Sequence, residues 1–214
     1  MITVHVFGNA PPPVHGITRD LRALWALEES GLPYRVRPLD FARGELRAAE
    51  HLRVNPFGHL PSIDDDGFRL FESAAIVLYV LDKAGRLVPG DAQRRAVALQ
   101  WAFAAVNTVE PAMAELFGID QFSSDQAWAK ERRPAVVERV KTVLAILDGE
   151  LTGRSYLMGA EFSAPDILMA TVLRLVQHTD LLGAVTHVAA YRARCEERPA
   201  WKKILAAYEQ RLAA

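Results

Sequence analysis

The stretch that decides the fold reads Asn55-Pro56-Phe57-Gly58-His59-Leu60-Pro61-Ser62-Ile63, and Phe71-Glu72-Ser73-Ala74-Ala75-Ile76 follows it closely. Pro61 opens a strand-like run, where a missing backbone N–H normally weakens a sheet. A cis Leu60–Pro61 bond would turn the backbone and leave the N–H and C=O of Leu60 to pair with an extended ligand. Ser73 begins an apolar helix, and the N-terminus of a helix favours a carboxylate. Together these features predict a groove that binds a short peptide by its backbone and its carboxylate.

The composition limits the class of protein. The chain has 214 residues, half of them apolar, and its 25 basic and 26 acidic residues leave a net charge of −1. Nucleic-acid binding typically needs a basic excess, and no apolar run is long enough to span a bilayer. Met1-Ile2-Thr3-Val4 lacks the features of a signal peptide, and the single cysteine, Cys195, excludes an internal disulfide. The histidines do not have the spacing of a metal site. We therefore expect a cytoplasmic protein that binds no metal, nucleic acid or membrane.

The first half of the chain predicts one mixed four-stranded sheet covered by helices. Alternation of apolar and polar residues predicts strands, and Asp65-Asp66-Gly67 predicts a hairpin turn between two of them. A strand–helix–strand order favours a parallel pair, with the second strand at an edge. The expected elements are a strand at 2–7, a helix from Thr18 to Ser30, a strand at 34–39, a short helix at 45–52, strands at 60–63 and 68–71, and a helix at 73–84.

Beyond residue 90 the chain predicts helices alone. Apolar residues recur at three- and four-residue steps over 91–115 and 128–151, as in a packed bundle. Ser163 and Asp166 predict a helix start with a capping box, and the last helical region is interrupted at Arg198-Pro199. We therefore expect an α/β domain at residues 1–84, a linker at 85–90 and an all-helical domain at 91–214.

This layout resembles the cytosolic glutathione S-transferase superfamily over nearly the whole chain. The motifs that carry the resemblance are residues 55–61 and 71–76, Leu-Glu-Glu-Ser-Gly-Leu-Pro-Tyr at 27–34, Phe-Ser-Ala-Pro-Asp-Ile at 162–167 and Arg-Pro-Ala-Trp at 198–201. They look most like the phi and theta branches and their bacterial relatives. The resemblance implies a thioredoxin-like N-terminal domain, an all-helical C-terminal domain, glutathione as cosubstrate and a homodimer.

The resemblance also implies roles for individual residues in binding glutathione. Leu60, before a cis Pro61, would pair through its backbone with the cysteinyl part, and Glu72 and Ser73 would hold the γ-glutamyl end. His59 matches a position that often reaches the backbone of glutathione, and Arg47 matches a basic residue that often meets the glycyl carboxylate. Phe103 and Asn107 are our candidates for the electrophile pocket in the helical domain, although core packing explains them equally well.

The resemblance also implies that Thr18 faces the glutathione sulfur. Theta-like members carry a Ser or Thr four residues before an Arg in the first helix, and here Thr18 stands four residues before Arg22. A hydroxyl donor at a helix N-terminus would stabilise the thiolate. Thr18 also suits a helix N-cap. The serine position of the phi branch falls on Ile17, which cannot serve, so Asn9 and His15 remain alternatives.

These roles predict a glutathione S-transferase that joins the glutathione thiolate to a hydrophobic electrophile. The absence of a cysteine near Thr18 argues against the branches that form a mixed disulfide. A glutathione-dependent peroxidase, isomerase or dehalogenase, or a non-catalytic glutathione-binding protein, would use the same fold.

Overall fold

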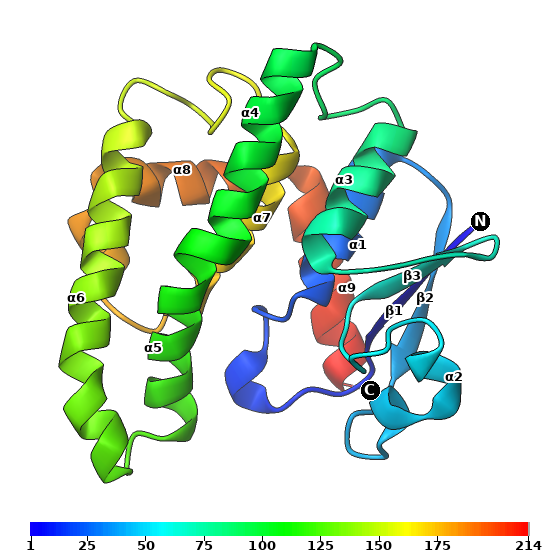
Figure 1. Ribbon diagram of the computed structural model, residues 1–214, viewed down its shortest axis with the longest axis horizontal. Coiled ribbons are helices and arrows are strands. Elements are labelled where there is room, and N and C mark those ends of the chain that lie inside the picture. The colour runs from blue at the N-terminus through cyan, green and yellow to red at the C-terminus, as the bar shows by residue number, and fades with distance from the viewer. Residues whose placement is uncertain (214) are drawn as a thin grey trace. The chain divides into compact units, whose positions relative to one another are not determined.

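The computed structural model describes residues 1–213 of the chain, which fold into two compact units (Figure 1). The first unit contains Met1–Val88 together with the chain from Arg198 onward, and the second contains Pro89–Glu197. The first half of the chain supplies the sheet and the second half is helical, as the sequence predicts.

The sheet has the expected mixed topology. Its strands are β1 (Ile2–Phe7), β2 (Tyr34–Leu39), β3 (Ser62–Asp65) and β4 (Phe68–Phe71), and they lie in the order β2-β1-β3-β4. β1 is parallel to β2 and antiparallel to β3, and β3 pairs with β4 as a hairpin. β2 is therefore an edge strand, as predicted. β3 begins at Ser62 rather than Leu60, because Pro61 has no N–H to give to a ladder.

One face of the sheet forms the core of the first unit. Ile2, Val4, Val6 and Ile63 alternate with polar residues along β1 and β3 and are almost completely buried. Helices α1 (Asp20–Ser30) and α3 (Ser73–Lys83) pack side by side against this layer (Figure 1). α1 ends where Gly31 takes the left-handed conformation, at φ 70°, as the Gly stop predicts.

The other face of the sheet is polar and faces a short helical segment. This segment consists of a 3₁₀ turn at Glu45–Arg47 and the helix α2 (Ala49–Leu52). The two are separate because Ala48 between them has an extended backbone, with ψ 143°. The single helix expected at 45–52 is therefore wrong in this detail.

The C-terminal helix α9 (Pro199–Ala213) packs within the first unit, against α1. The rings of Trp25 and Trp201 have centroids 4.7 Å apart. The Arg198 guanidinium donates to both carboxylate oxygens of Glu29, at 2.6 and 2.7 Å. By its packing, α9 therefore belongs to the unit that contains the sheet. The sequence instead assigns residues 91–214 to one helical domain, and this division into domains stays a prediction.

The second unit is helical throughout. Its helices are α4 (Ala92–Phe103), a π-helical segment (Ala104–Val109), α5 (Glu110–Phe122), α6 (Ala127–Glu150), α7 (Ala164–Leu173), 3₁₀ turns at Arg174–Val176 and Leu181–Ala184, and α8 (Thr186–Glu196). The helix expected at 91–115 is instead α4 and α5 joined through the π-helical segment. The capping box predicted at the start of α7 is confirmed, with Ser163 as N-cap and Asp166 at N3. Within residues 1–213, no helix has the length and apolar character needed to cross a membrane.

Candidate functional site

The loop before β3 is held by one buried side chain. Asn55 is 3% exposed; its Nδ2 donates to the carbonyl of His59 at 2.9 Å, and its Oδ1 accepts from the N–H of Phe57 at 3.0 Å. The same His59 carbonyl accepts a second hydrogen bond, from Nε2 of the buried His51 at 3.1 Å. Two donors therefore fix the backbone immediately before Leu60.

The loop also requires a glycine at position 58. Gly58 has φ 63°, which side-chain-bearing residues rarely adopt. A Cβ there would lie 2.8 Å from the carbonyl oxygen of Leu46, which is closer than packing allows. The glycine of the Asn-Pro-Phe-Gly motif is thus a structural requirement of this turn.

The Leu60–Pro61 peptide bond is cis, which confirms the prediction from the sequence. The Leu60 side chain is buried in a small cluster with Leu39 and Leu46, and Phe7 packs against this cluster. Its backbone lies at the start of β3, just outside the hydrogen-bonded ladder.

Two further predicted residues lie on the surface of the same loop. His59 is exposed, with its ring 6.5 Å from that of Phe57 and nearly parallel to it. Arg47 is also exposed, and its Nη1 donates to the Phe57 carbonyl at 3.1 Å. That single bond leaves other guanidinium N–H groups of Arg47 for a carboxylate.

The β3–β4 hairpin brings the two halves of the predicted binding groove together. Ser62 is paired with Phe71 in the antiparallel register. Pro61 and Glu72 each lie one residue outside this pair, so they are neighbours at the same end of the hairpin. The sequence predicts the two motifs separately, and the sheet places them side by side.

Glu72 and Ser73 form the start of α3. Glu72 is exposed and has a positive φ of 72°, an unfavourable conformation that tends to occur at functional sites. Ser73 is buried, and its Oγ accepts from Nη1 of Arg22 at 3.1 Å. The guanidinium adds to the positive potential that backbone N–H groups create at a helix N-terminus. A carboxylate bound here would meet both sources of positive potential.

Thr18 lies in the buried base of the loop between β1 and α1. It is 8% exposed, and its Oγ1 donates to the phenolic oxygen of Tyr208 on α9 at 3.0 Å. Its expected role as helix N-cap is wrong, because the N-cap of α1 is Arg19. The side chain is engaged with a residue that is distant in the sequence instead of with the first turn of the helix.

The two alternatives to Thr18 have other partners. Asn9 donates from Nδ2 to Asp40 Oδ1 at 2.9 Å and accepts from the Phe41 N–H at 3.1 Å. His15 donates from Nε2 to the Ala10 carbonyl at 2.8 Å.

Phe103 and Asn107 both lie on the surface of the helical unit. Phe103 ends α4 and is 62% exposed, and Asn107 is exposed within the π-helical segment. Such segments are often found at functional sites. Exposure removes core packing as the explanation for Phe103.

Sequence reasoning missed the contacts of three residues that support the site: Arg22, which it used only to locate Thr18, and His51 and Tyr208. The position of Arg22 could have been recognised, because it interrupts the apolar run at 21–27 and a charged residue is buried in such a run only when it is paired. No feature of the sequence indicates that His51 is buried, since it looks like one more residue of a polar segment. No feature of the sequence indicates the contact of Tyr208 either, since its partner Thr18 is 190 positions away in the chain.

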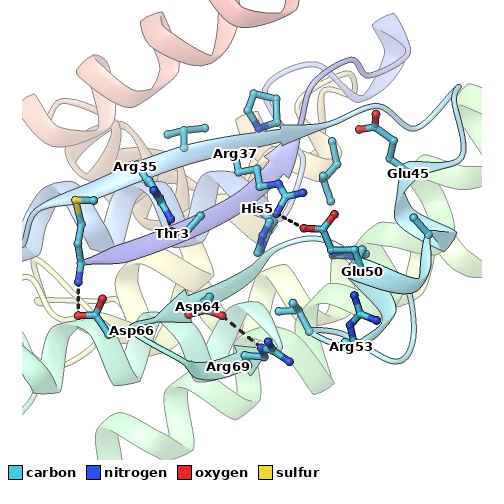
Figure 2. Close-up of a pocket in the computed structure, with 17 residues that line it drawn as sticks. Thr3, His5, Arg35, Arg37, Glu45, Glu50, Arg53, Asp64, Asp66 and Arg69 are labelled. Carbon is cyan, nitrogen blue, oxygen red and sulfur yellow. Dashed lines mark hydrogen bonds and ion pairs between the residues drawn. The ribbon is translucent and has the colours of Figure 1, made fainter.

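A cavity of about 1060 Å³ lies on the other face of the sheet, between the strands and α2 (Figure 2). Four of its charged side chains form two ion pairs, Arg37 with Glu50 at 2.9 Å and Arg69 with Asp64 at 3.3 Å. His5 lies on the same face; burial, with Arg37 and His51 nearby, lowers its pKa to about 4. We interpret this face as a polar layer whose charges are partly neutralised by ion pairs within it, separate from the site at the end of the hairpin.

In the described residues no group of three or more His, Cys, Asp or Glu could hold a metal ion.

Comparison with known families and proteins agrees with this geometry. Residues 13–82 match the family described as "Glutathione S-transferase, N-terminal domain", and residues 105–199 match "Glutathione S-transferase, C-terminal domain". A probable glutathione S-transferase of Oryza sativa subsp. japonica is 32% identical over 213 residues, covering 91% of this chain and 96% of that protein. Glutathione S-transferase 4 of Zea mays is 32% identical over 192 residues, covering 86% and 85%.

Solved structures give the same answer. A glutathione transferase family member from Pseudomonas fluorescens pf-5, with two glutathione bound, superposes with a TM-score of 0.85 at 25% identity, covering 95% of this chain and 92% of that one. A glutathione transferase from Burkholderia graminis, with two glutathione molecules bound per protein subunit, superposes with a TM-score of 0.85 at 27% identity, covering 96% of this chain and 88% of that one. Both domains match in order, and a relative of nearly the same length shares almost a third of its residues, so this protein belongs to the glutathione S-transferase family.

Proposed function

We propose that this protein is a glutathione S-transferase that transfers glutathione to a hydrophobic electrophile. The observation that carries the proposal is the meeting of Leu60–Pro61 with Glu72–Ser73 at one end of the β3–β4 hairpin, where Arg22 supports Ser73. An extended tripeptide with a carboxylate and an amino group at one end matches these groups. The glutathione found in structural neighbours further supports the choice of ligand.

In the proposed complex each part of glutathione has a partner. Ser73 and its backbone N–H donate to the γ-glutamyl carboxylate, and the exposed Glu72 carboxylate accepts from the amino group. The backbone of Leu60 pairs with the cysteinyl part. Arg47 meets the glycyl carboxylate, and His59 contacts the peptide backbone. Charge-assisted hydrogen bonds of this kind are the strongest available to such a ligand.

The chemistry in this proposal consists of ionising the thiol and aiming the thiolate. A free thiol has a pKa of about 8.5, so a donor that stabilises the thiolate raises the reactive fraction at neutral pH. Thr18 is the proposed donor. The thiol proton leaves to solvent, the thiolate forms a carbon–sulfur bond with the electrophile, and the leaving group departs with its electron pair. No covalent enzyme intermediate is needed.

The electrophile would bind to the helical unit. Phe103 offers an exposed aromatic face and Asn107 an exposed amide. Peroxidase, isomerase and dehalogenase reactions would use the same glutathione site, and profiling with a peroxide, an isomerisable ketone and an alkyl halide separates them. We also propose that the protein is a cytoplasmic homodimer, which light scattering after gel filtration would test.

Glutathione binding and conjugation are the direct test. Calorimetry should show glutathione binding, and 1-chloro-2,4-dinitrobenzene should be conjugated. The variant Glu72→Ala should bind glutathione at least about tenfold more weakly, because it loses a charge-assisted contact. Glu138→Ala, an exposed position on α6, is the matched control and should behave as wild type. Absence of both binding and conjugation, or a Glu72→Ala variant that binds normally, would overturn the proposal.

A further inference from the structure

Helix α9 closes the base of the loop that connects β1 to α1. Tyr208 is fully buried, and its phenolic oxygen bonds to Thr18 Oγ1 at 3.0 Å. Burial raises the pKa of Tyr208, while hydrogen bonds from Thr18 and from the backbone of Gly16 oppose that rise. Tyr208 is therefore a neutral phenol that can both accept and donate.

The same helix also holds the other end of this loop. Arg211 on α9 donates from Nε to the carbonyl of Phe7 at 3.0 Å, and the N–H of Phe7 donates to Asp20 Oδ2, also at 3.0 Å. The Arg211 guanidinium lies 3.7 Å from that carboxylate oxygen. Residues from both ends of the loop, Phe7 and Thr18, are thus attached to one helix.

Asp20 contributes a buried carboxylate to this cluster. Its side chain is completely buried, and burial raises its pKa, while the hydrogen bond from the Phe7 N–H and the nearby Arg211 guanidinium oppose that rise. Within residues 1–213, its Oδ1 is among the few buried side-chain atoms without a hydrogen-bond partner. A buried unsatisfied carboxylate oxygen is costly, and such exceptions in native proteins call for an explanation.

Thr18 has one hydroxyl proton, and its direction decides what the residue can do. In the hydrogen bond described above, the Thr18 hydroxyl donates to the phenolic oxygen of Tyr208. Two hydroxyls in contact can exchange roles, since either can donate. If Tyr208 donates to Thr18 Oγ1, the Thr18 proton becomes available to a group outside the cluster. A donor that is itself hydrogen-bonded in this way is also strengthened by polarisation.

We propose that Tyr208 is a positioning residue for glutathione activation, which acts by donating its hydroxyl proton to Thr18 and so directing the Thr18 hydroxyl to the glutathione sulfur. This inference rests on the proposed function. It assigns to the C-terminal helix a part in the chemistry. Glutathione binding itself, at Leu60 and Ser73, does not depend on Tyr208.

The test is to remove only the phenolic hydroxyl, with Tyr208→Phe. Ultraviolet absorbance of bound thiolate, titrated with pH, should show a thiol pKa closer to that of free glutathione. The value of kcat/KM for 1-chloro-2,4-dinitrobenzene should fall about tenfold near neutral pH and approach the wild-type value above pH of about 9, where the thiol ionises without help. The KM for glutathione should stay within about twofold, because no binding contact is lost.

The control is Tyr191→Phe, which removes another buried tyrosine hydroxyl. Tyr191 Oη donates to Asp166 Oδ1 at 2.9 Å in the helical unit, so its loss affects stability without touching the first unit. A variant with 3-fluorotyrosine at position 208 keeps the shape of the side chain and makes it a stronger donor. It should lower the thiol pKa, which gives a result even where Tyr208→Phe fails to fold.

The outcomes separate this inference from the function on which it rests. A Tyr208→Phe protein with a lower melting temperature and an unchanged pH profile would show a purely structural role and overturn the inference. So would a thiol pKa that responds to Thr18→Ala but not to either change at position 208, and the proposed function would then stand. A wild-type protein that neither binds the thiolate nor conjugates would overturn both. The double variant Thr18→Ala/Tyr208→Phe should match Thr18→Ala alone.

Discussion

Arg22 on α1 donates from Nη1 to the hydroxyl of Ser73, the first residue of α3, across 3.1 Å in the buried interior of the first unit. This contact joins the two helices that cover the sheet at the point where we propose that glutathione binds. It places a fixed positive charge behind a serine that would otherwise rely on the helix N-terminus alone.

Removing this charge should weaken glutathione binding. We expect Arg22→Leu to raise the dissociation constant at least about tenfold, and Arg22→Lys to have a smaller effect because it keeps the charge but not the fork of donors. Arg22→Leu should also lower the free energy of unfolding by about 1–3 kcal/mol. Calorimetry and urea titration measure the two effects. Arg35→Leu, on the opposite face of the sheet, should bind glutathione normally; equal binding by Arg22→Leu and wild type would contradict the prediction.

Glu72 should show a conflict between stability and binding. Its φ of 72° is unfavourable for any residue except glycine. We therefore expect Glu72→Gly to be more stable than Glu72→Ala by about 1 kcal/mol, while both bind glutathione poorly because both lack the carboxylate. The same pair of changes at Glu131, an exposed position inside α6, should have the opposite order, with alanine about 1 kcal/mol more stable. Thermal or urea unfolding of the four variants is sufficient, and a stability order at Glu72 that matches the order at Glu131 would refute the argument.

Gly58→Ala should damage the loop before β3 by two mechanisms, an unfavourable φ and a collision with the Leu46 carbonyl. Gly44 provides a control with the first mechanism only, because its φ is 73° and a Cβ there meets nothing within 4 Å. We expect Gly44→Ala to cost about 1 kcal/mol and Gly58→Ala about 1–3 kcal/mol more. Only Gly58→Ala should also weaken glutathione binding, since it shifts the backbone next to Leu60. Similar unfolding curves for the two variants would show that the collision is relieved cheaply.

His5 predicts how stability depends on pH. Burial above all, with Arg37 and His51 nearby, lowers its pKa from 6.5 to about 4 in the folded protein. The unfolded chain therefore binds more protons between these two values, so this contribution to stability is fully present above pH 6.5 and is lost as the pH falls towards 4. Its size is at most about 3 kcal/mol.

The measurement is the difference in unfolding free energy between pH 7.5 and pH 5 for wild type and for His5→Gln. The variant should lose less stability on acidification, because it has no imidazole to protonate. His15→Gln, at an exposed position where the imidazole donates to the Ala10 carbonyl, is the control and should follow wild type. If His5→Gln and wild type lose stability in parallel, another group is responsible for the acid sensitivity.

The elements of the fold could be predicted from the sequence wherever the cause is local. The alternation in β1, the Asp65-Asp66-Gly67 turn and the Ser163–Asp166 capping box each depend on neighbouring residues, and each is present as predicted. The π-helical segment escaped prediction because one extra residue per turn does not disturb an apolar pattern enough to be seen.

The site could be predicted only in part, for the same physical reason. Leu60, Pro61 and Glu72 belong to motifs that a reader can recognise, and the hairpin register brings them together. The surroundings of Thr18 depend on Tyr208, and no local pattern connects the two residues. When a side chain bonds to a residue far away in the sequence, its neighbours in the sequence can suggest the wrong role. Thr18 is an example, since its neighbours suggest a helix N-cap whereas its partner is Tyr208.

The way in which His59 is held has a consequence for how the family can diversify. Its carbonyl is fixed from behind by Asn55 and His51, while its side chain extends into solvent. At this position the backbone carbonyl fixes the loop, and the side chain is free of that structural role. Selection could exchange the imidazole for another group, and so change the contact that we propose with glutathione, without moving the peptide plane that precedes the cis proline. A site arranged in this way can accumulate new side chains one at a time while the backbone beneath them stays the same.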